Sequence, residues 1–275
     1  MRRLLFALIS ATLAFSAEPG YVVAALTLTP EPWANERNLL KLERFARQAA
    51  QRGAQVIVAP EGYLEGYVGN QGRTPDLQQA RYAAEAAEDL NGPLLQRVAA
   101  LARELRVYLM LGFAERRDGK VFNTAVMFSP SGALASRYAK SHTMNDEPFN
   151  TKGTVFPVTQ TEHGQWGTLI CFDRQVPETA RLLAIQGADT LFVPAWGGHG
   201  EMNDQMMRVR AYENGVNLVF VHPKRALLID SSGKILAQNE SEADQIVMAR
   251  MSVSPKRKHS MLKYRRPELY GDLAK

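Results

Sequence analysis

The pattern of apolar and polar residues along the chain predicts buried strands that alternate with amphipathic helices. Apolar runs at residues 21–28 and 55–60 predict two strands. Between them, apolar residues recur at helical spacing after Asn35, which can cap a helix that closes at Gly53. Another helix is predicted over residues 91–102. The alternation indicates sheets covered by helices.

The middle of the chain carries the signals of antiparallel hairpins. The pair Asp118-Gly119 predicts a tight turn, and a stretch with little periodicity covers residues 141–153. Two short strands are expected around His163-Gly164. Further strands are predicted at residues 107–113, 121–128 and 133–140. Because no linker-like stretch interrupts these elements, residues 18–275 are predicted to form one domain, with two packed sheets covered by helices.

The first 17 residues have a different pattern. Two arginines precede an apolar stretch at residues 4–15, and the small residues Ser16 and Ala17 follow it. This layout predicts a signal peptide over residues 1–17, cleaved near Ser16 or Ala17, and hence an exported protein, periplasmic or secreted. The stretch is shorter than the ~20 residues of a membrane span. A retained anchor is the second interpretation, and no stable membrane insertion is expected.

Composition and charge exclude several classes of protein. Apolar residues make up 45% of the chain and charged residues 22%, which is typical of a soluble globular domain. The net charge of +5 is modest, and the densest basic run, residues 256–259, lacks the interleaved aromatic residues of a nucleic-acid surface. We therefore expect no nucleic-acid partner.

Cys171 is the only cysteine, so it cannot form an intrachain disulfide or, by itself, a metal cage. It lies where an apolar, strand-like run meets the start of a helix. The N–H groups at a helix N-terminus favour a thiolate over a thiol, so we expect a nucleophile with a lowered pKa. The alternative is a small, buried, apolar residue.

Glu61 and Lys140 also follow predicted strands, and sites in α/β sheets form where strands end. Hydrolysis of a C–N bond requires three groups of this kind. A thiol needs a base, and a partly desolvated carboxylate can accept its proton and later deliver it to the leaving amine. A cation beside backbone N–H groups can stabilise the tetrahedral oxyanion. Taken singly, either residue could instead be an ordinary surface charge.

From about residue 21 to 270 the sequence resembles the nitrilase, or carbon–nitrogen hydrolase, superfamily. The motifs that carry the resemblance are residues 58–63 (VAPEGY), 137–142 (RYAKSH), 171–173 (CFD) with Pro177, Glu178 and Arg181, 194–196 (PAW), 210–214 (RAYEN) and 265–270 (RRPELY). The resemblance implies a four-layer αββα sandwich. It implies a triad in which Glu61 is the general base and acid, Lys140 the oxyanion cation and Cys171 the nucleophile. It also implies a thioester acyl-enzyme, no cofactor, and homodimers or higher homo-oligomers.

The resemblance suggests further site residues. Many members carry another glutamate shortly after the lysine, and Glu147 matches it, although a solvated loop carboxylate is the alternative. The backbone N–H of Phe172 is the expected second oxyanion donor. Tyr63 and Trp196 are candidates for the walls of the acyl site, or else they are core aromatics. His142, His199 and His222 lack metal-ligand spacing, so no metal site is predicted.

The two residues after Cys171 indicate which class of substrate is expected. Phe172-Asp173 resembles the amide- and carbamoyl-hydrolysing branches, whereas true nitrilases usually have tryptophan and glutamate there. We therefore expect a linear, non-peptide amide as substrate, then an N-carbamoyl compound, then a nitrile. Residues 197–200 and 222–225 depart from the family pattern, so no particular substrate is implied. A catalytically silent binding or scaffold protein is the alternative from another class, and the intact triad argues against it.

Overall fold

The computed structural model describes residues 19–239, 241–253 and 261–274. The predicted signal peptide and the basic run at residues 256–259 lie outside these residues. In the described part of the chain, no helix is both long and apolar enough to cross a membrane.

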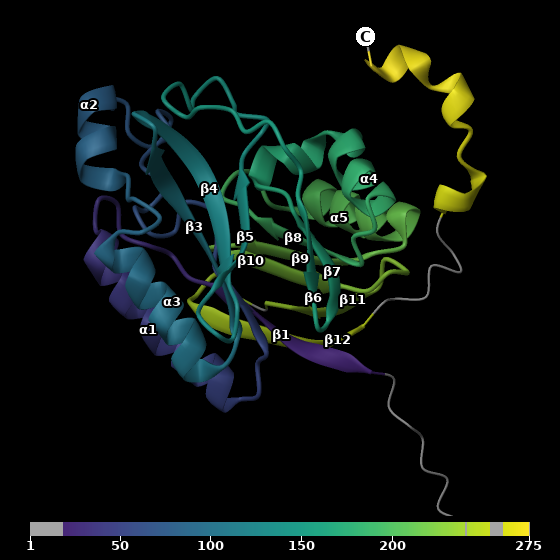
Figure 1. The fold of residues 1–275 in the computed structure, drawn as a ribbon, viewed down its shortest axis with the longest axis horizontal. Helices are drawn as coiled ribbons and strands as arrows, with labels where there is room; N and C mark the ends of the chain where they lie inside the picture. Colours follow the sequence, from purple (N-terminus) through teal and green to yellow (C-terminus); the bar gives the residue numbers. More distant parts are fainter. Residues whose placement is uncertain (1–18, 240, 254–260, 275) are drawn as a thin grey trace, which may run out of the picture.

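Two six-stranded sheets form the centre of the molecule (Figure 1). The first has the order β12-β1-β2-β3-β4-β5, and the second β11-β10-β9-β8-β7-β6. The strands of the first sheet are β12 (Gln245–Ser252), β1 (Gly20–Thr27), β2 (Val56–Val58), β3 (Tyr108–Arg117), β4 (Lys120–Phe128) and β5 (Leu134–Ala139). The strands of the second are β11 (Ile235–Gln238), β10 (Arg225–Ile229), β9 (Asn217–His222), β8 (Thr190–Pro194), β7 (Gly164–Thr168) and β6 (Val158–Thr161).

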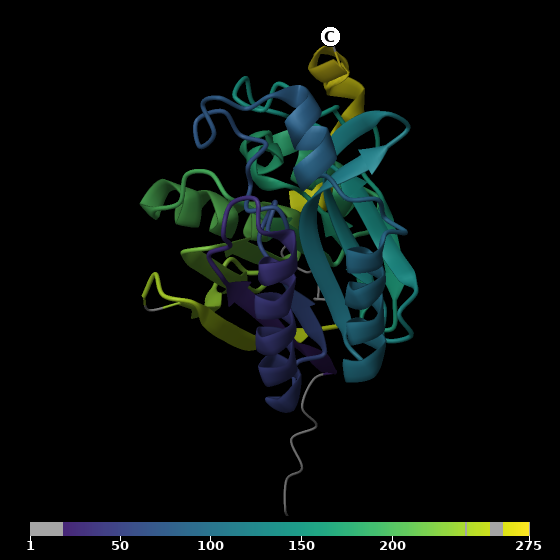
Figure 2. The same cartoon turned by 90° about the vertical axis from the view of Figure 1, so that its left-hand side faces the viewer.

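Helices cover the outer face of each sheet (Figures 1 and 2). Helices α1 (Asn35–Gln51) and α3 (Pro93–Leu105) share an apolar core with the first sheet. Helices α4 (Pro177–Ile185) and α5 (Glu201–Asn214) share one with the second. A third apolar layer joins the two inner faces. The predicted αββα sandwich is therefore confirmed.

The helical periodicity of the sequence explains why α1 packs as it does. Leu39, Leu42, Ala46 and Ala49 are fully buried on one side of the helix. The chain then leaves the helix through Gly53, whose positive φ of 88° favours glycine. A short helix, α2 (Gln79–Arg81), and the helical turn Tyr82–Ala86 that follows it were not predicted, because residues 69–86 have no clear apolar periodicity.

The strand β2 is shorter than the predicted run, because the chain leaves the sheet at Ala59. Gly112 of β3 lies against the departing backbone: a Cβ on Gly112 would come within 2.5 Å of the Pro60 carbonyl oxygen and 2.8 Å of the Glu61 Cα. Only glycine permits this approach. The missing side chain therefore sets where Glu61 emerges from the sheet.

Asp173 connects the loop after β5 to the loop after β7. Its carboxylate accepts hydrogen bonds from the Tyr138 hydroxyl at 2.7 Å and from the backbone N–H groups of His142 and Ile170, both at 2.9 Å. The Nδ1 atom of His142 is 2.8 Å from the same carboxylate. Because Asp173 is fully buried, these contacts hold the two loops in a fixed relation.

Replacing this buried carboxylate should lower stability in a pH-dependent way. We expect Asp173→Asn to reduce the free energy of unfolding by about 1–3 kcal/mol, because an amide cannot accept from the same set of donors. The hydrogen bond to Asp173 raises the pKa of His142 above its usual 6.5. The pair therefore stabilises the fold fully below pH 6.5 and loses its effect as the pH rises through the raised pKa.

Urea unfolding of both proteins at about pH 6 and about pH 9 measures this effect. The difference between wild type and Asp173→Asn should be larger at the lower pH. In a His142→Asn background the pH-dependent part should vanish. A difference that is the same at both pH values would contradict the ion pair.

Candidate active site

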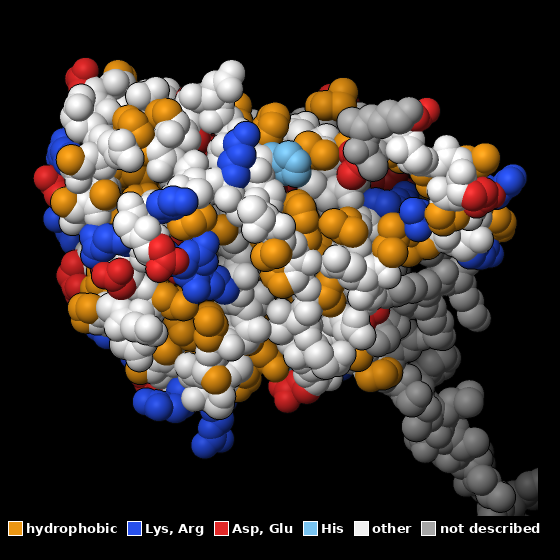
Figure 3. Space-filling model, turned by 45° about the horizontal axis from the view of Figure 1, so that its top comes forward, with side chains coloured by type: hydrophobic (Ala, Val, Ile, Leu, Met, Phe, Trp, Pro, Cys, Tyr) orange, Lys and Arg blue, Asp and Glu red, His pale blue; other side chains and the backbone are white. Residues whose placement is uncertain are grey.

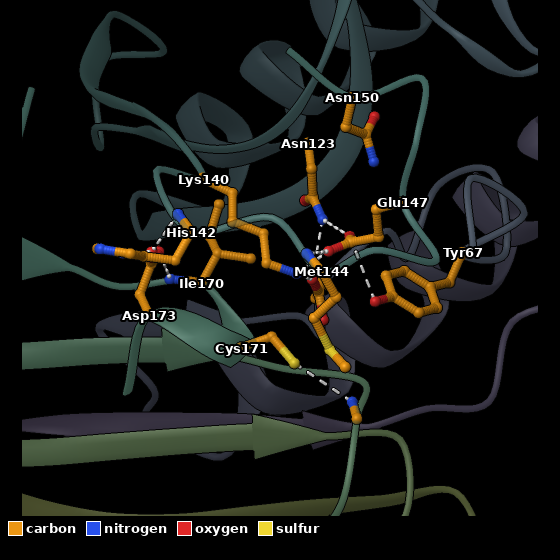
Figure 4. A network of polar contacts seen from close by, with 12 residues as sticks. Tyr67, Asn123, Lys140, His142, Met144, Glu147, Asn150, Ile170, Cys171 and Asp173 are labelled. Carbon is orange, nitrogen blue, oxygen red and sulfur yellow. Dashed lines mark hydrogen bonds and ion pairs between the residues drawn. The ribbon is translucent and has the colours of Figure 1, made fainter. Parts of the chain in front are cut away.

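Three charged side chains from distant parts of the sequence meet in the interior. Glu61 follows β2, Lys140 follows β5, and Glu147 lies in the loop after Lys140. The Lys140 Nζ atom donates to Glu61 Oε1 at 2.9 Å and to Glu147 Oε2 at 2.7 Å. All three side chains are fully buried. The two carboxylates thus share one ammonium group (Figure 4).

Asn123 of β4 completes this group, which we call the acid–lysine cluster: Glu61, Asn123, Lys140 and Glu147. Its Nδ2 atom donates to Glu61 Oε1 at 2.8 Å and to Glu147 Oε1 at 3.1 Å. The second oxygen of Glu61, Oε2, has no hydrogen-bond partner among the described residues. One oxygen of Glu61 is therefore held in place, while the other is available to accept a proton.

Glu147 is a buried part of the cluster, not a solvated loop carboxylate. Besides Lys140 and Asn123, it accepts from the Met144 backbone N–H at 3.0 Å and from the Tyr67 hydroxyl at 3.4 Å. Asn123 and Tyr67 were not predicted from the sequence. A signal for Asn123 exists, because it interrupts the apolar run of a buried strand.

Cys171 lies at the predicted junction between strand and helix. It begins the short 3₁₀ helix Cys171–Gln175, and two residues separate it from Thr168, the last residue of β7. Its φ of 44° lies in the left-handed region, which is strained for a residue with a side chain. Figure 4 shows Cys171 beside the acid–lysine cluster, and the charges of Glu61 and Lys140 both act on its thiol. The Gly197 backbone N–H donates to this sulfur at 3.4 Å, and Arg174 Nη1 donates to it at 3.3 Å.

The electrostatics of the thiol differ from our expectation. Burial raises the pKa of Cys171, and the charge of Glu61 raises it further, while Lys140 and Arg174 act in the opposite direction. The prediction of a lowered thiol pKa was therefore wrong. It considered only the helix N-terminus, which here belongs to a single short turn, and the cost of burying a negative sulfur is larger.

The pKa values of Glu61 and Lys140 are both raised. A raised pKa suits Glu61 to accept a proton and keeps Lys140 charged. Burial raises the pKa of Glu61, and the charge of Lys140 only partly opposes this. Burial alone would lower the pKa of Lys140, but the charges of Glu61, Cys171 and Glu147 raise it above its usual value. Lys140 is therefore a permanent cation, whereas Glu61 is a carboxylate whose proton affinity is enhanced.

Of the other predicted site residues, Phe172 and Trp196 lie near the acid–lysine cluster or Cys171, and Tyr63 does not. Phe172 follows Cys171 in the first turn of the 3₁₀ helix, where backbone N–H groups lack an acceptor within the helix. Trp196 is nearly buried and stacks on Tyr67, with ring centroids 5.3 Å apart. Since Tyr67 also contacts Glu147, Trp196 borders the cluster.

Tyr63 does not lie beside the acid–lysine cluster. Its ring packs in the core between the first sheet and α1, and its hydroxyl donates to the Asn38 carbonyl oxygen at 3.1 Å. The turn after Glu61 directs Tyr67 toward the site and Tyr63 away from it. Tyr67 thus takes the position that we had assigned to Tyr63.

Of the three histidines for which no metal site was predicted, two lie together. The rings of His199 and His222 are 4.2 Å apart, and His222 Nε2 contacts the Trp196 carbonyl oxygen. Burial lowers the pKa of His222 to about 3, so its ring is neutral. Within the described ranges, no group of three or more histidine, cysteine, aspartate or glutamate residues is arranged to hold a metal ion.

Comparisons with known proteins place the chain in a family. The family model described as "Carbon-nitrogen hydrolase" matches residues 22–255. The chain is 32% identical over 195 residues to an N-carbamoylputrescine amidase of Solanum tuberosum, covering 66% of this chain and 63% of that one. It is 30% identical over 240 residues to an (R)-stereoselective amidase of a Pseudomonas species, covering 79% and 81%.

Among solved structures, an amidase from a Nesterenkonia species superposes with a TM-score of 0.77 at 20% identity, covering 96% of this chain and 100% of that one. At this identity the match supports the fold. The family model, which spans most of the chain, supports the family itself. The chain therefore belongs to the carbon–nitrogen hydrolase family.

Proposed function

We propose that this protein hydrolyses a linear, non-peptide amide through a Glu61–Lys140–Cys171 triad, releasing ammonia or an amine. The observation that carries the proposal is the convergence of a carboxylate with a free oxygen, a fixed ammonium and a hydrogen-bonded sulfur. The three residues come from the ends of three strands in two sheets. A scaffold protein without catalysis would not need to bury these charges, which is costly.

In the acylation half, Glu61 Oε2 accepts the proton of the Cys171 thiol, and the sulfur attacks the amide carbonyl carbon. A C–S bond forms, and the carbonyl π electrons move onto oxygen. Lys140 and the Phe172 N–H stabilise this oxyanion. As the carbonyl re-forms, the C–N bond breaks, and Glu61 gives its proton to the departing nitrogen, so ammonia or an amine leaves.

In the deacylation half, water attacks the thioester on Cys171. Glu61, now ionised again, accepts a proton from the water, and a C–O bond forms. The C–S bond then breaks, the sulfur recovers a proton from Glu61, and the product leaves as a carboxylic acid. Glu147 acts through Lys140 and Asn123, because it holds the ammonium and the amide in the position from which they serve Glu61.

Two observations bear on the substrate class. The residues after the nucleophile, Phe172-Asp173, resemble the amide- and carbamoyl-hydrolysing branches. The similarity to an N-carbamoylputrescine amidase supports N-carbamoyl hydrolysis as the second candidate, and the similarity to a stereoselective amidase supports simple amides. A nitrile is the third candidate, and another relative, from Schizosaccharomyces pombe and 27% identical over 278 residues, is described as a probable nitrilase. An N-carbamoyl substrate would release carbon dioxide in addition to ammonia.

A panel of amides, N-carbamoyl amino acids and nitriles, scored by ammonia release, tests the proposal. Cys171→Ala should lower kcat/KM at least about a thousandfold on every substrate found, because no other group can form the thioester. Glu61→Gln should lose a comparable amount. Ser141→Ala, outside the acid–lysine cluster, is the matched control and should retain most activity.

Mass spectrometry of the acid-quenched wild-type reaction should find an acyl group on Cys171. Circular dichroism should show that Cys171→Ala is folded. If folded Cys171→Ala keeps most of its activity, this mechanism is wrong.

We further propose that residues 1–17 direct export and are then removed. The basic residues, the apolar stretch and the small residues before position 18 support this. When the full-length chain is expressed in a bacterial host with an intact export pathway, the exported protein should have an N-terminus near residue 17 or 18, as read by N-terminal sequencing. Recovery of protein that begins at Met1 only would contradict export.

We also propose that the protein assembles as a homodimer, with a second copy covering α4 and the segment 261–274. That segment lies at the edge of the molecule in Figure 1, where its residues 261–264 contact α5. Its Tyr264, Leu269 and Leu273 are exposed, as are Leu182 and Ile185 of α4. Figure 3, which brings the top of the molecule forward, shows apolar side chains across this face. Exposed apolar groups of this extent support an interface.

Analytical ultracentrifugation should find a dimer. The double variant Leu182→Glu, Ile185→Glu should sediment as a monomer, because it places charges in the proposed interface. Leu40→Glu changes a similarly exposed leucine on α1, on the opposite side of the sandwich, and should leave the dimer intact. A monomeric wild-type protein would overturn the proposal.

A further inference from the structure

Arg174 is a buried cation beside the nucleophile, and the mechanism above does not use it. Its side chain belongs to the 3₁₀ helix that Cys171 begins, and Arg174 is only 1% exposed. The guanidinium donates from Nη1 to Cys171 Sγ at 3.3 Å, from Nε to Asn203 Oδ1 at 2.8 Å and from Nη2 to the Gly198 carbonyl oxygen at 2.6 Å. One edge of the guanidinium is thus directed at the sulfur.

The partners of Arg174 are neutral. Across the described ranges, no carboxylate forms an ion pair with Arg174, in contrast to Lys140, which is held by two. The Phe220 ring lies beneath the guanidinium, with the Cζ atom 5.3 Å from the ring centroid. A buried charge without a counter-ion is costly, so its retention suggests a negative charge that is present only part of the time.

A count of charges shows where that negative charge would arise. With Glu61 and Glu147 ionised and Lys140 protonated, the acid–lysine cluster carries a net charge of −1, and Arg174 brings the sum over the cluster and Arg174 to zero. When Glu61 takes the thiol proton, the total does not change, but one negative charge moves from the carboxylate to the sulfur. It therefore moves to the atom that Arg174 contacts.

We propose that Arg174 is a catalytic residue whose guanidinium, together with the Gly197 N–H, stabilises the Cys171 thiolate as Glu61 accepts the thiol proton. The proposal rests on the function proposed above, since it requires Cys171 to be the nucleophile. Arg174 is suited to this task because its planar head donates to the sulfur while Asn203 and Gly198 hold its other nitrogens.

The other titratable groups that act on the sulfur do not replace Arg174. Glu61 disfavours the thiolate, and Lys140 favours it. The Lys140 ammonium donates to two carboxylates, whereas the Arg174 guanidinium donates to the sulfur itself. Tyr67, which also faces the thiol, is a neutral phenol because burial raises its pKa well above the usual value. Arg174 is therefore a cation in direct contact with the sulfur.

The pH dependence of alkylation tests the proposal without any substrate. The rate of Cys171 alkylation by iodoacetamide is measured from pH 6 to about pH 11, and the midpoint of its rise reports the thiol titration. Because each curve is scaled to its own plateau, the midpoint does not depend on how easily the reagent enters. We expect Arg174→Met to raise the midpoint by at least about one pH unit, corresponding to a tenfold smaller thiolate fraction.

The same variant should lower kcat at least about tenfold with little change in KM. Arg174→Gln removes the charge but keeps a polar head for Asn203 and Gly198, so it serves if the methionine variant does not fold, and its midpoint should also rise. Arg208→Gln is the matched control: it removes an arginine of α5 whose Nε donates to the Gly233 carbonyl oxygen and not to the sulfur, and its midpoint should lie within a few tenths of wild type.

An unchanged midpoint in folded Arg174→Gln would overturn the proposal. A loss confined to KM would overturn it as well, because Arg174 would then act on the substrate and not on the sulfur. A midpoint that rises equally in Arg208→Gln would also overturn it, because the shift would then not depend on a contact with the sulfur. Failure of the proposed function itself is distinguishable, since Cys171→Ala would then keep its activity whatever the behaviour of Arg174.

Discussion

The ammonium of Lys140, buried between the carboxylates of Glu61 and Glu147, is the interaction on which the rest of the site depends. Two carboxylates this close together, without a cation, would not both stay ionised in a protein interior. One ammonium and the amide of Asn123 hold both of them. Because these contacts use only one oxygen of Glu61, the other remains unpartnered. The same interaction thus fixes the cation and leaves a base.

In the proposed mechanism, the nucleophile does not need a lowered pKa in the resting protein. Burial keeps Cys171 as a thiol, and a base of raised pKa lies in the same interior. The proton can then move between two buried groups without a change in total charge, which avoids the cost of creating a new charge in a medium of low polarity. The proposed mechanism thus relies on a thiol and a carboxylate whose pKa values are both raised, with Arg174 and the Gly197 N–H placed where the negative charge would go.

The sandwich supplies the geometry because strands of both sheets end at one place. The Glu61 loop leaves the first sheet where Gly112 allows its backbone to come close. The Lys140 loop and the Cys171 loop come from different sheets, and Asp173 joins them through hydrogen bonds from both. A strained backbone at Cys171 completes the junction. Positions far apart in the chain are therefore held by a few buried polar contacts, supported by the apolar layers of the fold.

Much of this was determined by the sequence alone. Helical periodicity placed α1 and α3, apolar runs placed the first strands of both sheets, and the ordered motifs indicated the family and the residues Glu61, Lys140, Cys171 and Glu147. These features are local or are repeated as linear motifs, so they can be read without coordinates. The position of Cys171 near the end of a strand could also be predicted from the local pattern.

Only the tertiary structure decided the surroundings of those residues. Whether Tyr63 or Tyr67 faces the site depends on the course of one turn, and the contacts of Asn123 and Arg174 join residues far apart in the chain. The thiol pKa depends on total burial and on charges from several elements, which no local pattern records. The sequence thus determined which chemical groups are available, and the folded chain decided their protonation and their neighbours, because both follow from distances in space and not from spacing along the chain.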